Sequence, residues 1–313
     1  MTKQYVFLFP GQGSQFVGMG KFLAEHFIAK STFQEANHAL GFDLTKLMWE
    51  GPEEELKQTQ NAQPAILAVE VTIGRILLDK GIQPSIMAGH SLGEYACLVL
   101  SGAMEFQDAI VAVHQRGKYM QEVVPVGKGT MTAVLGLEDD AIVESVCKEI
   151  SDQGFLVEPA NYNCPGQLVI SGTVEGVEKA SILLKERGAK RCIPLQVSAP
   201  FHCSMLKPAG LKLGKDLEKI LFKDPEVPYI ANVDVQRITK SDQIRNRLIE
   251  QVWSPVRWTP TLQMLSKDFA LAQFIEVGPG KVICGHMKKV NHAIQCLSSD
   301  TQENLETALL TAN

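Results

Sequence analysis

The chain has 313 residues, 45% of them hydrophobic and 21% charged, so it can bury a sizeable core and has room for about two domains. Its net charge of −5 argues against nucleic-acid binding, and no apolar run approaches the roughly 18 residues of a membrane span. The seven cysteines lack C-x-x-C spacing and are odd in number. They indicate neither a disulfide framework nor a metal site, and a reducing, cytoplasmic location is expected.

The first predicted element is a buried strand over residues 5–9, which ends in a glycine-rich loop at residues 10–15 (PGQGSQ). Phe16 and Met19 stand where a phosphate loop would need a third glycine and a lysine, so that interpretation fails. Loops at the carboxyl ends of central strands bind ligands in α/β sheets. The loop therefore either brings its backbone close to a reacting group, with the Gln12 amide as an oxyanion donor, or is a tight turn without a chemical role.

The motif with the clearest chemistry is GHSLG at residues 89–93, a G-x-S-x-G pattern. An amphipathic helix is predicted for residues 64–80, a short buried strand for residues 86–88, and a second helix for residues 94–100. Strand, sharp turn and helix in that order predict a nucleophile elbow with Ser91 as the nucleophile. The alternative is an ordinary glycine-bounded turn between a strand and a helix.

Residues 106–122 predict a helix whose apolar stripe includes Arg116. A buried guanidinium is unfavourable unless it pairs with an anion or extends to solvent. A neighbouring carboxylate such as Glu122 is one possible structural partner. The functional alternative is that Arg116 binds a carboxylate of the substrate, since its planar fork grips that group with two hydrogen bonds.

The pattern changes at Gly127 and Gly129, after which a βαββαβ series is predicted. The predicted elements are a strand at 131–137, a helix at 139–150, strands at 156–160 and 167–171, a helix at 174–187 and a strand at 191–197. This order is that of a ferredoxin-like unit. We therefore expect residues 127–198 to form a small domain inserted into a larger α/β domain of residues 1–126 and 199–313.

The segment SAPFHCS at residues 198–204 leads back to the large domain, so His202 is expected at the cleft between the two. A serine nucleophile needs a base, and His202 is the leading candidate, although a histidine at such a junction can also be structural. His90 is adjacent to the serine, but neighbouring side chains on a tight turn point apart. Cys203 has no activating pattern and is expected to be a bystander thiol. The remaining predicted elements are helices at 207–222 and 244–251, a strand at 229–233 and a last buried strand with its turn at 274–280.

Taken together, a set of short motifs resembles the malonyl-CoA:acyl-carrier-protein transacylase family over nearly the whole chain. The motifs are FPGQGSQ at 9–15, GHSLGEY at 89–95, Arg116, NYN at 161–163, PGQ at 165–167, PFH at 200–202, Gln251 and EVGPG at 276–280. The resemblance implies a hydrolase-like α/β large domain with a parallel central sheet and a ferredoxin-like small domain. It implies transfer of a malonyl group from coenzyme A to the phosphopantetheine thiol of acyl carrier protein, for fatty acid or polyketide synthesis, with the coenzyme A thioester as substrate and no tightly bound cofactor.

The resemblance also assigns roles to matching positions. They are Ser91 as nucleophile, His202 as base, the Gln12 and Leu92 amides as oxyanion hole, Arg116 for the malonyl carboxylate, the Gln251 main-chain carbonyl to orient the base, and Asn161, Asn163 and Phe201 for substrate. The resulting Ser–His dyad lacks an acidic third member. A thiolate leaving group needs less protonation than an amine, since the pKa of a thiol is near 8.5, so a weaker base suffices.

Two other functions remain open at this point. A serine hydrolase would use water as the acceptor and would share the elbow, but an enzyme for neutral acyl chains has no use for a buried Arg116. A non-catalytic module that docks a carrier protein would tolerate loss of Ser91 and His202, yet both residues are present.

Overall fold

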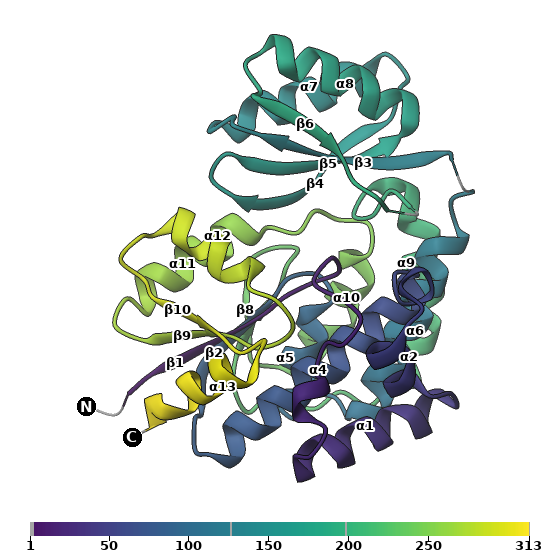
Figure 1. Cartoon of the computed structure of the whole chain (residues 1–313). Coiled ribbons are helices and arrows are strands. Elements are labelled where there is room, and N and C mark those ends of the chain that lie inside the picture. The colour runs from purple at the N-terminus through teal and green to yellow at the C-terminus, as the bar shows by residue number, and fades with distance from the viewer. Residues whose placement is uncertain (1–2, 126, 198, 313) are drawn as a thin grey trace.

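The computed structural model describes residues 3–125, 127–197 and 199–312, and the strands in these ranges form two separate sheets (Figure 1). The larger sheet has the order β10-β9-β1-β2-β7-β8 and is parallel except for β8 at its edge. Its strands are β1 (Tyr5–Phe9), β2 (Pro84–Gly89), β7 (Tyr229–Ile230), β8 (Arg237–Ile238), β9 (Gln273–Glu276) and β10 (Cys296–Ser298). The predicted parallel sheet around residues 5–9 and 86–88 is confirmed.

Helices pack against both sheets. In the described residues they are α1 (Phe27–Leu40), α2 (Leu44–Glu50), α3 (Glu53–Leu56), α4 (Thr59–Asp79), α5 (Gly93–Leu100), α6 (Phe106–Glu122), α7 (Asp140–Asp152), α8 (Val174–Glu186), α9 (Lys207–Leu217), α10 (Ile244–Gln251), α11 (Trp258–Asp268), α12 (Val282–Val290) and α13 (Gln302–Leu309). The predicted bounds of α6 and α10 are confirmed at both ends. No helix in these ranges is both long and apolar enough to cross a membrane.

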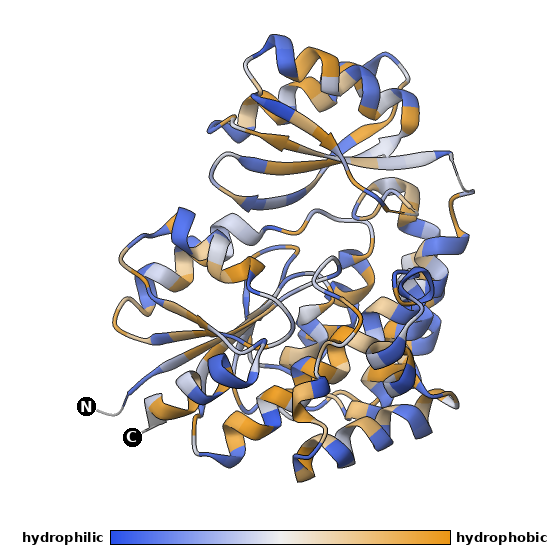
Figure 2. Ribbon diagram, in the orientation of Figure 1, coloured by the Kyte–Doolittle hydropathy of each residue, from blue (hydrophilic) through white to orange (hydrophobic). Residues whose placement is uncertain are grey.

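The larger sheet is covered on both faces, which explains the continuous apolar runs of its strands. Val6 and Leu8 of β1 pack in one cluster with residues of α11 and α12. Phe7 and Phe9 point the other way, into a second cluster built largely from α1, α4, α5 and α6. Hydrophobic residues accordingly gather in the central strands and on the inward faces of these helices (Figure 2). The alternation of a strand therefore fixes which helices each side chain contacts.

The second sheet is antiparallel and has the order β4-β5-β3-β6. Its strands are β3 (Gly129–Leu135), β4 (Val157–Cys164), β5 (Gln167–Thr173) and β6 (Arg191–Pro194). Helices α7 and α8 cover one face, while the opposite face, which includes Met131, Ala133 and Val169, joins the core of the rest of the chain. The chain order β3-α7-β4-β5-α8-β6 matches the predicted series of strands and helices.

All four strands of the second sheet end at positions other than those predicted, and β4 and β6 differ the most. Strand β4 continues past residue 160 because the Tyr162 N–H donates to Val256 O over 3.0 Å and the Val256 N–H donates to Ala160 O over 2.8 Å. Strand β6 ends at Pro194, before the predicted residue 197. The chain there turns away from the sheet, and residues 195–197 line a cavity instead.

Helix α4 begins at Thr59, five residues earlier than predicted, and therefore contains Pro64. A proline inside a helix leaves the carbonyl four residues before it without its usual N–H donor. Here that carbonyl belongs to Gln60, and His114 Nδ1 of α6 lies 2.7 Å from it. Because a carbonyl oxygen only accepts, His114 donates this bond and replaces the missing one, which explains why the helix can start ahead of the proline.

Other boundaries differ because tertiary contacts compete with local preference. The helix predicted to reach residue 222 ends at Leu217, and the Lys223 N–H instead donates to Ala103 O. The strand predicted for residues 229–233 ends at Ile230. The strand predicted to be the last is followed by β10, a three-residue strand that pairs with β9.

Strands β1 and β2 lie side by side with Phe9 paired to Gly89, so the loops that follow them meet at one edge of the sheet. A side chain at Gly89 would overlap the backbone of Gly93, and one at Gly93 would overlap the carbonyl of Phe9. Both glycines are therefore required by close backbone approach. This edge carries the candidate site.

Candidate active site

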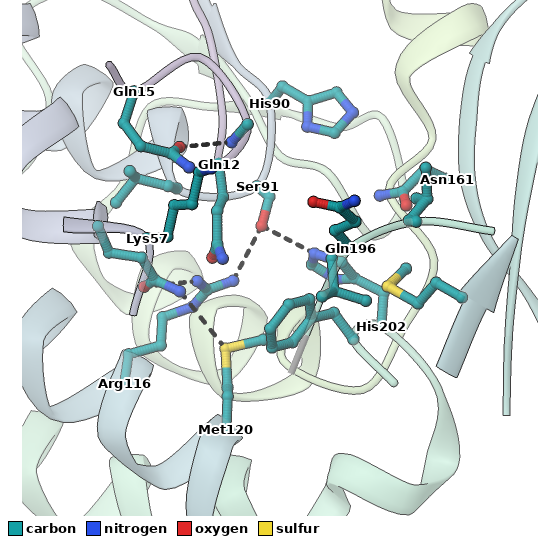
Figure 3. Close-up of a pocket in the computed structure, with 17 residues that line it drawn as sticks. Gln12, Gln15, Lys57, His90, Ser91, Arg116, Met120, Asn161, Gln196 and His202 are labelled. Atoms are coloured by element: carbon teal, nitrogen blue, oxygen red, sulfur yellow. Dashed lines mark hydrogen bonds between the residues drawn. The ribbon is translucent and has the colours of Figure 1, made fainter. Parts of the chain in front are cut away.

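Ser91 lies on a sharp turn between β2 and α5 and has a φ of 52°, in the left-handed region. Its hydroxyl is the meeting point of two other side chains (Figure 3). Ser91 Oγ is 2.8 Å from His202 Nε2, although the two residues are 111 positions apart, and it accepts a 3.0 Å hydrogen bond from Arg116 Nη2. The structure thus brings together the three side chains on which the sequence-based prediction depends.

The contacts of His202 fix the position of its proton. Nδ1 lies 2.9 Å from Gln251 O and 3.2 Å from Ser254 O, and both carbonyls can only accept. Nδ1 therefore carries the hydrogen, which leaves the lone pair of Nε2 directed at the Ser91 hydroxyl. No carboxylate among the described residues hydrogen-bonds to this ring. His202 also has a positive φ, 58°.

Burial, and next the positive charge of Arg116, lowers the pKa of His202 to about 3. A general base must be neutral, and His202 stays neutral down to this pH. If Ser91 is acylated with His202 as base, as the resemblance implies, the acylation rate should change by less than about threefold between about pH 7.5 and about pH 5. A base with an ordinary pKa near 6.5 would lose roughly thirtyfold over the same range.

The measurement is a stopped-flow acylation rate in the first seconds after a pH jump. Speed matters because the unfolded chain takes up a proton on this histidine below about pH 6.5 while the folded chain does not, so stability falls as the pH is lowered. An inflection in the rate near pH 6.5 would contradict the expectation.

Arg116 is almost fully buried, with 1% of its surface exposed, and has no ion-pair partner among the described residues. Nη1 donates to Gln63 Oε1 over 2.8 Å, and Nη2 donates to Gln251 Oε1 over 3.0 Å as well as to Ser91. The prediction that Glu122 could be the structural partner of Arg116 is wrong. The Glu122 carboxylate lies on the exposed side of α6, where its Oε1 is 4.0 Å from Lys118 Nζ. A guanidinium held by neutral groups leaves a buried positive charge available to an anion.

A network beneath the serine holds the turn in place. Asn232 Oδ1 accepts from the Ser91 N–H over 2.7 Å, and its Nδ2 donates to Gly89 O over 2.7 Å. Gln251 Nε2 donates to Ser91 O over 2.9 Å and to Glu94 Oε2 over 2.7 Å. The Asn232 N–H donates to the same Glu94 oxygen over 3.1 Å. Burial raises the pKa of Glu94 to about 7. We call these three residues, Glu94, Asn232 and Gln251, the elbow brace.

Sequence reasoning assigned no role to Glu94 or Asn232. Asn232 follows β7, which pairs in parallel with β2, so its side chain reaches the turn at the same edge of the sheet. Glu94 is a carboxylate in the first turn of an otherwise apolar helix. A polar residue directly after one buried strand and a charge inside an apolar helix were the available signals.

Replacing Asn232 by alanine should lower the acylation rate per intact site by about 10- to 100-fold, because the turn that holds Ser91 at a positive φ then loses two hydrogen bonds, one at the Ser91 N–H and one at Gly89 O. The resemblance implies that acylation releases coenzyme A, so the rate is measured from the burst of that release and normalised to the burst amplitude, which counts intact sites. Thr72→Ala removes another buried hydrogen bond, to Ala68 O in α4, and serves as the control. An unchanged normalised rate in Asn232→Ala would mean that the residue contributes only to stability.

The Ser91 hydroxyl opens into a cavity of about 350 Å³ whose walls come from both sheets. Lining residues from the larger part include Gln12, Gln63, Leu92, Met120 and Phe201, and those from the second sheet and the segment after it include Met131, Asn161, Leu195, Gln196 and Val197. Cys203 does not line it. Its thiol donates to Pro200 O, and burial raises the pKa of Cys203 to about 11. The cavity therefore lies between the predicted substrate residues and the serine.

The structure separates the two asparagines predicted to bind substrate. Asn161 lines the Ser91 cavity, but Asn163 does not; its Oδ1 lies 2.9 Å from His90 Nε2 and lines an adjoining cavity of about 180 Å³. The His90 ring packs edge-on against Trp258, so it points away from the Ser91 side chain as expected.

The two predicted oxyanion donors both border the Ser91 cavity. Leu92 is the N-cap residue of α5, directly before Gly93, and Gln12 lies in the loop after β1. Among residues 3–125, 127–197 and 199–312, neither main-chain amide donates a hydrogen bond, whereas the side-chain amide of Gln12 donates to Thr59 Oγ1. Two unengaged N–H groups beside the Ser91 hydroxyl form a geometry suited to a developing oxyanion.

The family profile and the related proteins that match this chain all point to one family. The acyl transferase domain profile matches residues 6–307. The chain is 47% identical to the malonyl CoA-acyl carrier protein transacylase of Bacillus subtilis, over 97% of this chain and 96% of that protein. It is 46% identical to the Haemophilus influenzae protein of the same name, over 95% of each.

Solved structures agree. An acyl carrier protein S-malonyltransferase from Vibrio cholerae has a TM-score of 0.94 and 44% identity, over 97% of this chain and 99% of that one. A malonyl-transacylase in complex with a type II PKS acyl-carrier protein has the same TM-score and identity, over 98% and 99%. The resemblance noted from the motifs is confirmed, and the chain belongs to the acyl transferase domain family, among its malonyl CoA-acyl carrier protein transacylases.

Proposed function

We propose that this chain transfers a malonyl group from coenzyme A to the phosphopantetheine thiol of an acyl carrier protein through a malonyl-serine intermediate, supplying units for fatty acid or polyketide synthesis. The observation that carries the proposal is the position of Ser91 Oγ. It lies 2.8 Å from an imidazole nitrogen that can only accept and 3.0 Å from a buried guanidinium that has no carboxylate partner among the described residues, and it lines a cavity.

In the first half-reaction, His202 Nε2 takes the hydroxyl proton as Ser91 Oγ bonds to the thioester carbon. The negative charge on the former carbonyl oxygen is stabilised by the Gln12 and Leu92 amides. The carbon–sulfur bond then breaks, and the imidazolium returns its proton to the departing coenzyme A thiolate. In the second half-reaction the carrier thiol attacks the malonyl ester by the same steps in reverse order.

The base works without an acidic neighbour. The Nδ1–H of His202 is oriented by the carbonyls of Gln251 and Ser254, which do the positioning that a carboxylate does in a catalytic triad. Two neutral acceptors stabilise the imidazolium less than a carboxylate does. A thiol leaving group with a pKa near 8.5 makes up for the difference, because it needs little protonation to depart.

Arg116 is proposed to select the malonyl group by binding its free carboxylate. The guanidinium is held at Nη1 and Nη2 by Gln63 and Gln251, while its Nε has no partner among the described residues. Phe201 and Asn161, which line the same cavity, would contact the rest of the acyl group, whereas Asn163 would act from the adjoining cavity.

We further propose that residues 127–198 are a ferredoxin-like small domain inserted into a hydrolase-like large domain of residues 1–126 and 199–313. The separate antiparallel sheet and its two covering helices support this division. Residues 1, 126, 198 and 313, at the proposed boundaries, lie outside the described residues. A cytoplasmic location and the lack of a tightly bound cofactor stay predictions from the sequence.

The test is a two-stage labelling experiment. The chain is mixed with malonyl-CoA, and one equivalent of coenzyme A should be released in a burst while the protein gains one malonyl mass. Carrier protein with its phosphopantetheine arm should then remove that mass, whereas carrier without the arm should leave it in place. Rapid release of free malonate without carrier would instead identify a hydrolase that uses water as the acceptor.

Charge around a neighbouring cavity suggests where the carrier approaches. The cavity that contains Asn163 shares Gln167 with a third cavity of about 590 Å³, whose lining includes Lys190, Arg191, Lys289 and His292. Adjoining cavities therefore lead from Ser91 to a surface with basic side chains. A pantetheine arm could lie along them, and the basic side chains could bind the phosphate at its end.

Reversing the charge at Lys190 (Lys190→Glu) should raise the KM for carrier protein by about 5- to 20-fold and leave the burst with malonyl-CoA within about threefold, because each charge near a docking surface contributes on the order of 1–2 kcal/mol. Lys148→Glu, on the exposed face of α7, which covers the second sheet, is the matched control. An unchanged carrier KM in Lys190→Glu would exclude this surface.

A further inference from the structure

Away from the active site, two thiols lie together where α12 approaches β10. Cys284 Sγ is 2.7 Å from Cys296 Sγ, and both residues are free cysteines. A disulfide bond is roughly 2.05 Å long, so the two sulfurs are less than about 1 Å farther apart than bonded sulfurs. No other pair of cysteine side chains among the described residues is in contact.

The backbone on each side of the pair is held by the same strand. The Cys284 N–H donates to Glu276 Oε2 over 2.7 Å, and the Ile283 N–H donates to Glu276 Oε1 over 3.0 Å, so the first turn of α12 is anchored on β9. Cys296 pairs with Phe274 of β9 in the parallel ladder. The two cysteines are therefore presented to each other by one rigid element, and bond formation needs only a small side-chain movement.

The pair is accessible from solvent. Both cysteines are half-buried and line a surface cavity of about 650 Å³ together with Lys281, Lys288 and His292. In contrast, four other cysteines are buried, namely Cys97, Cys147, Cys164 and Cys203. Cys192 is half-buried like the pair but has no second thiol beside it in the part of the chain that the structure describes. It therefore provides an internal control.

We propose that Cys284 and Cys296 form a reversible oxidation site, at which a small-molecule disulfide such as oxidised glutathione converts the two thiols into an intramolecular disulfide that ties α12 to β10. The site does not depend on the proposed transferase activity. Its physical consequence is local: α12 also carries Ile283 and His286, which line the cavity next to the Gln12 loop, so the crosslink fixes the wall of that cavity.

The order of the two steps follows from the direction of the hydrogen bond. Cys284 donates its S–H to Cys296 Sγ, and this bond, together with burial, raises the pKa of Cys284. Cys296 is therefore the attacking thiolate: its sulfur bonds to one sulfur of the external disulfide, whose S–S bond breaks and releases one thiolate. Cys284 then gives its proton to that thiolate and attacks Cys296 Sγ, which breaks the mixed disulfide and releases the second thiolate; this thiolate takes up from solvent the proton that Cys296 gave up on ionising. Two protein thiols are oxidised and one external disulfide is reduced to two thiols.

The experiment treats the folded chain with oxidised glutathione, blocks the remaining thiols, and maps the peptides by mass spectrometry. We expect a peptide pair joined through residues 284 and 296, with the loss of two hydrogens, formed at least about tenfold faster than any change at Cys192 and reversed by dithiothreitol. Cys284→Ser should accumulate a glutathione adduct on Cys296, because the resolving thiol is missing, whereas Cys296→Ser should leave Cys284 largely unmodified. Cys192→Ser should form the crosslink at the wild-type rate.

Two outcomes would overturn the inference. One is a stable glutathione adduct on each cysteine of the wild-type chain with no crosslink. The other is a crosslink that forms only after the chain is unfolded in urea, since the native geometry would then have no part in it. The burst of coenzyme A release, measured on the same samples, reports separately on the proposed transferase activity.

Discussion

Ser91→Ala should show no malonyl adduct after incubation with malonyl-CoA, and His202→Ala should form the adduct at least about a thousandfold more slowly than the wild-type chain. The serine variant lacks the only hydroxyl that faces His202 Nε2 among the described residues. The histidine variant keeps the hydroxyl but has no group to take its proton. The adduct is quantified by intact-protein mass and located by peptide mapping.

Folding of both variants is checked by thermal unfolding, because Ser91 and His202 are buried. His38→Ala, on the exposed surface of α1, is the matched histidine control and should acylate at the wild-type rate. An adduct that persists in Ser91→Ala, for example on Cys203, would assign the nucleophile to another residue. Equal rates in His202→Ala and the wild-type chain would remove the histidine from the mechanism.

Arg116→Ala should reduce kcat/KM for malonyl-CoA by about 10- to 150-fold, equivalent to about 1.5–3 kcal/mol of lost charge-assisted binding, while acetyl-CoA is used as well as before or better. The malonyl carboxylate is the only anionic part of the acyl group. A buried guanidinium that has no carboxylate partner among the described residues is matched to that charge and has nothing to offer a methyl group. Both substrates are compared by kcat/KM on one enzyme preparation.

Met120→Ala is the matched control for Arg116→Ala, because it enlarges the same cavity without removing a charge. It should change the two substrates by similar factors. If Arg116→Ala also lowered both substrates equally, the arginine would be acting on the architecture of the site, through Gln63 and Gln251, and not on malonyl selection.

Much of the fold follows from local patterns. The strand at residues 5–9 and the helices at 106–122 and 244–251 were predictable because each buries a continuous apolar run or one face of a 3.6-residue repeat. The early start of α4 was not, because it depends on His114 meeting the carbonyl that Pro64 leaves unpaired. Strand β10 has only three residues, too few for a periodic signal.

The candidate site also contains residues that local sequence could predict and residues that it could not. Ser91 and Arg116 were recognisable because each breaks a local rule, as a serine in a glycine-bounded turn and as a charge on an apolar stripe. The elbow brace was not recognisable, because Asn232 reaches Ser91 only through the pairing of β7 with β2. The separation of Asn163 from Asn161 likewise depends on how the end of β4 twists toward His90.

Ser91 and His202 share one property of the backbone: both adopt a positive φ that neither residue prefers on its own. Both residues are held by contacts from distant parts of the chain, Ser91 by Asn232 and His202 by Gln251, which a fragment or a partly assembled chain lacks. We therefore expect reactivity toward thioesters to arise only in the last stage of folding. Immature molecules would then be harmless to the cell's acyl-CoA supply, since the attacking group does not yet exist in them.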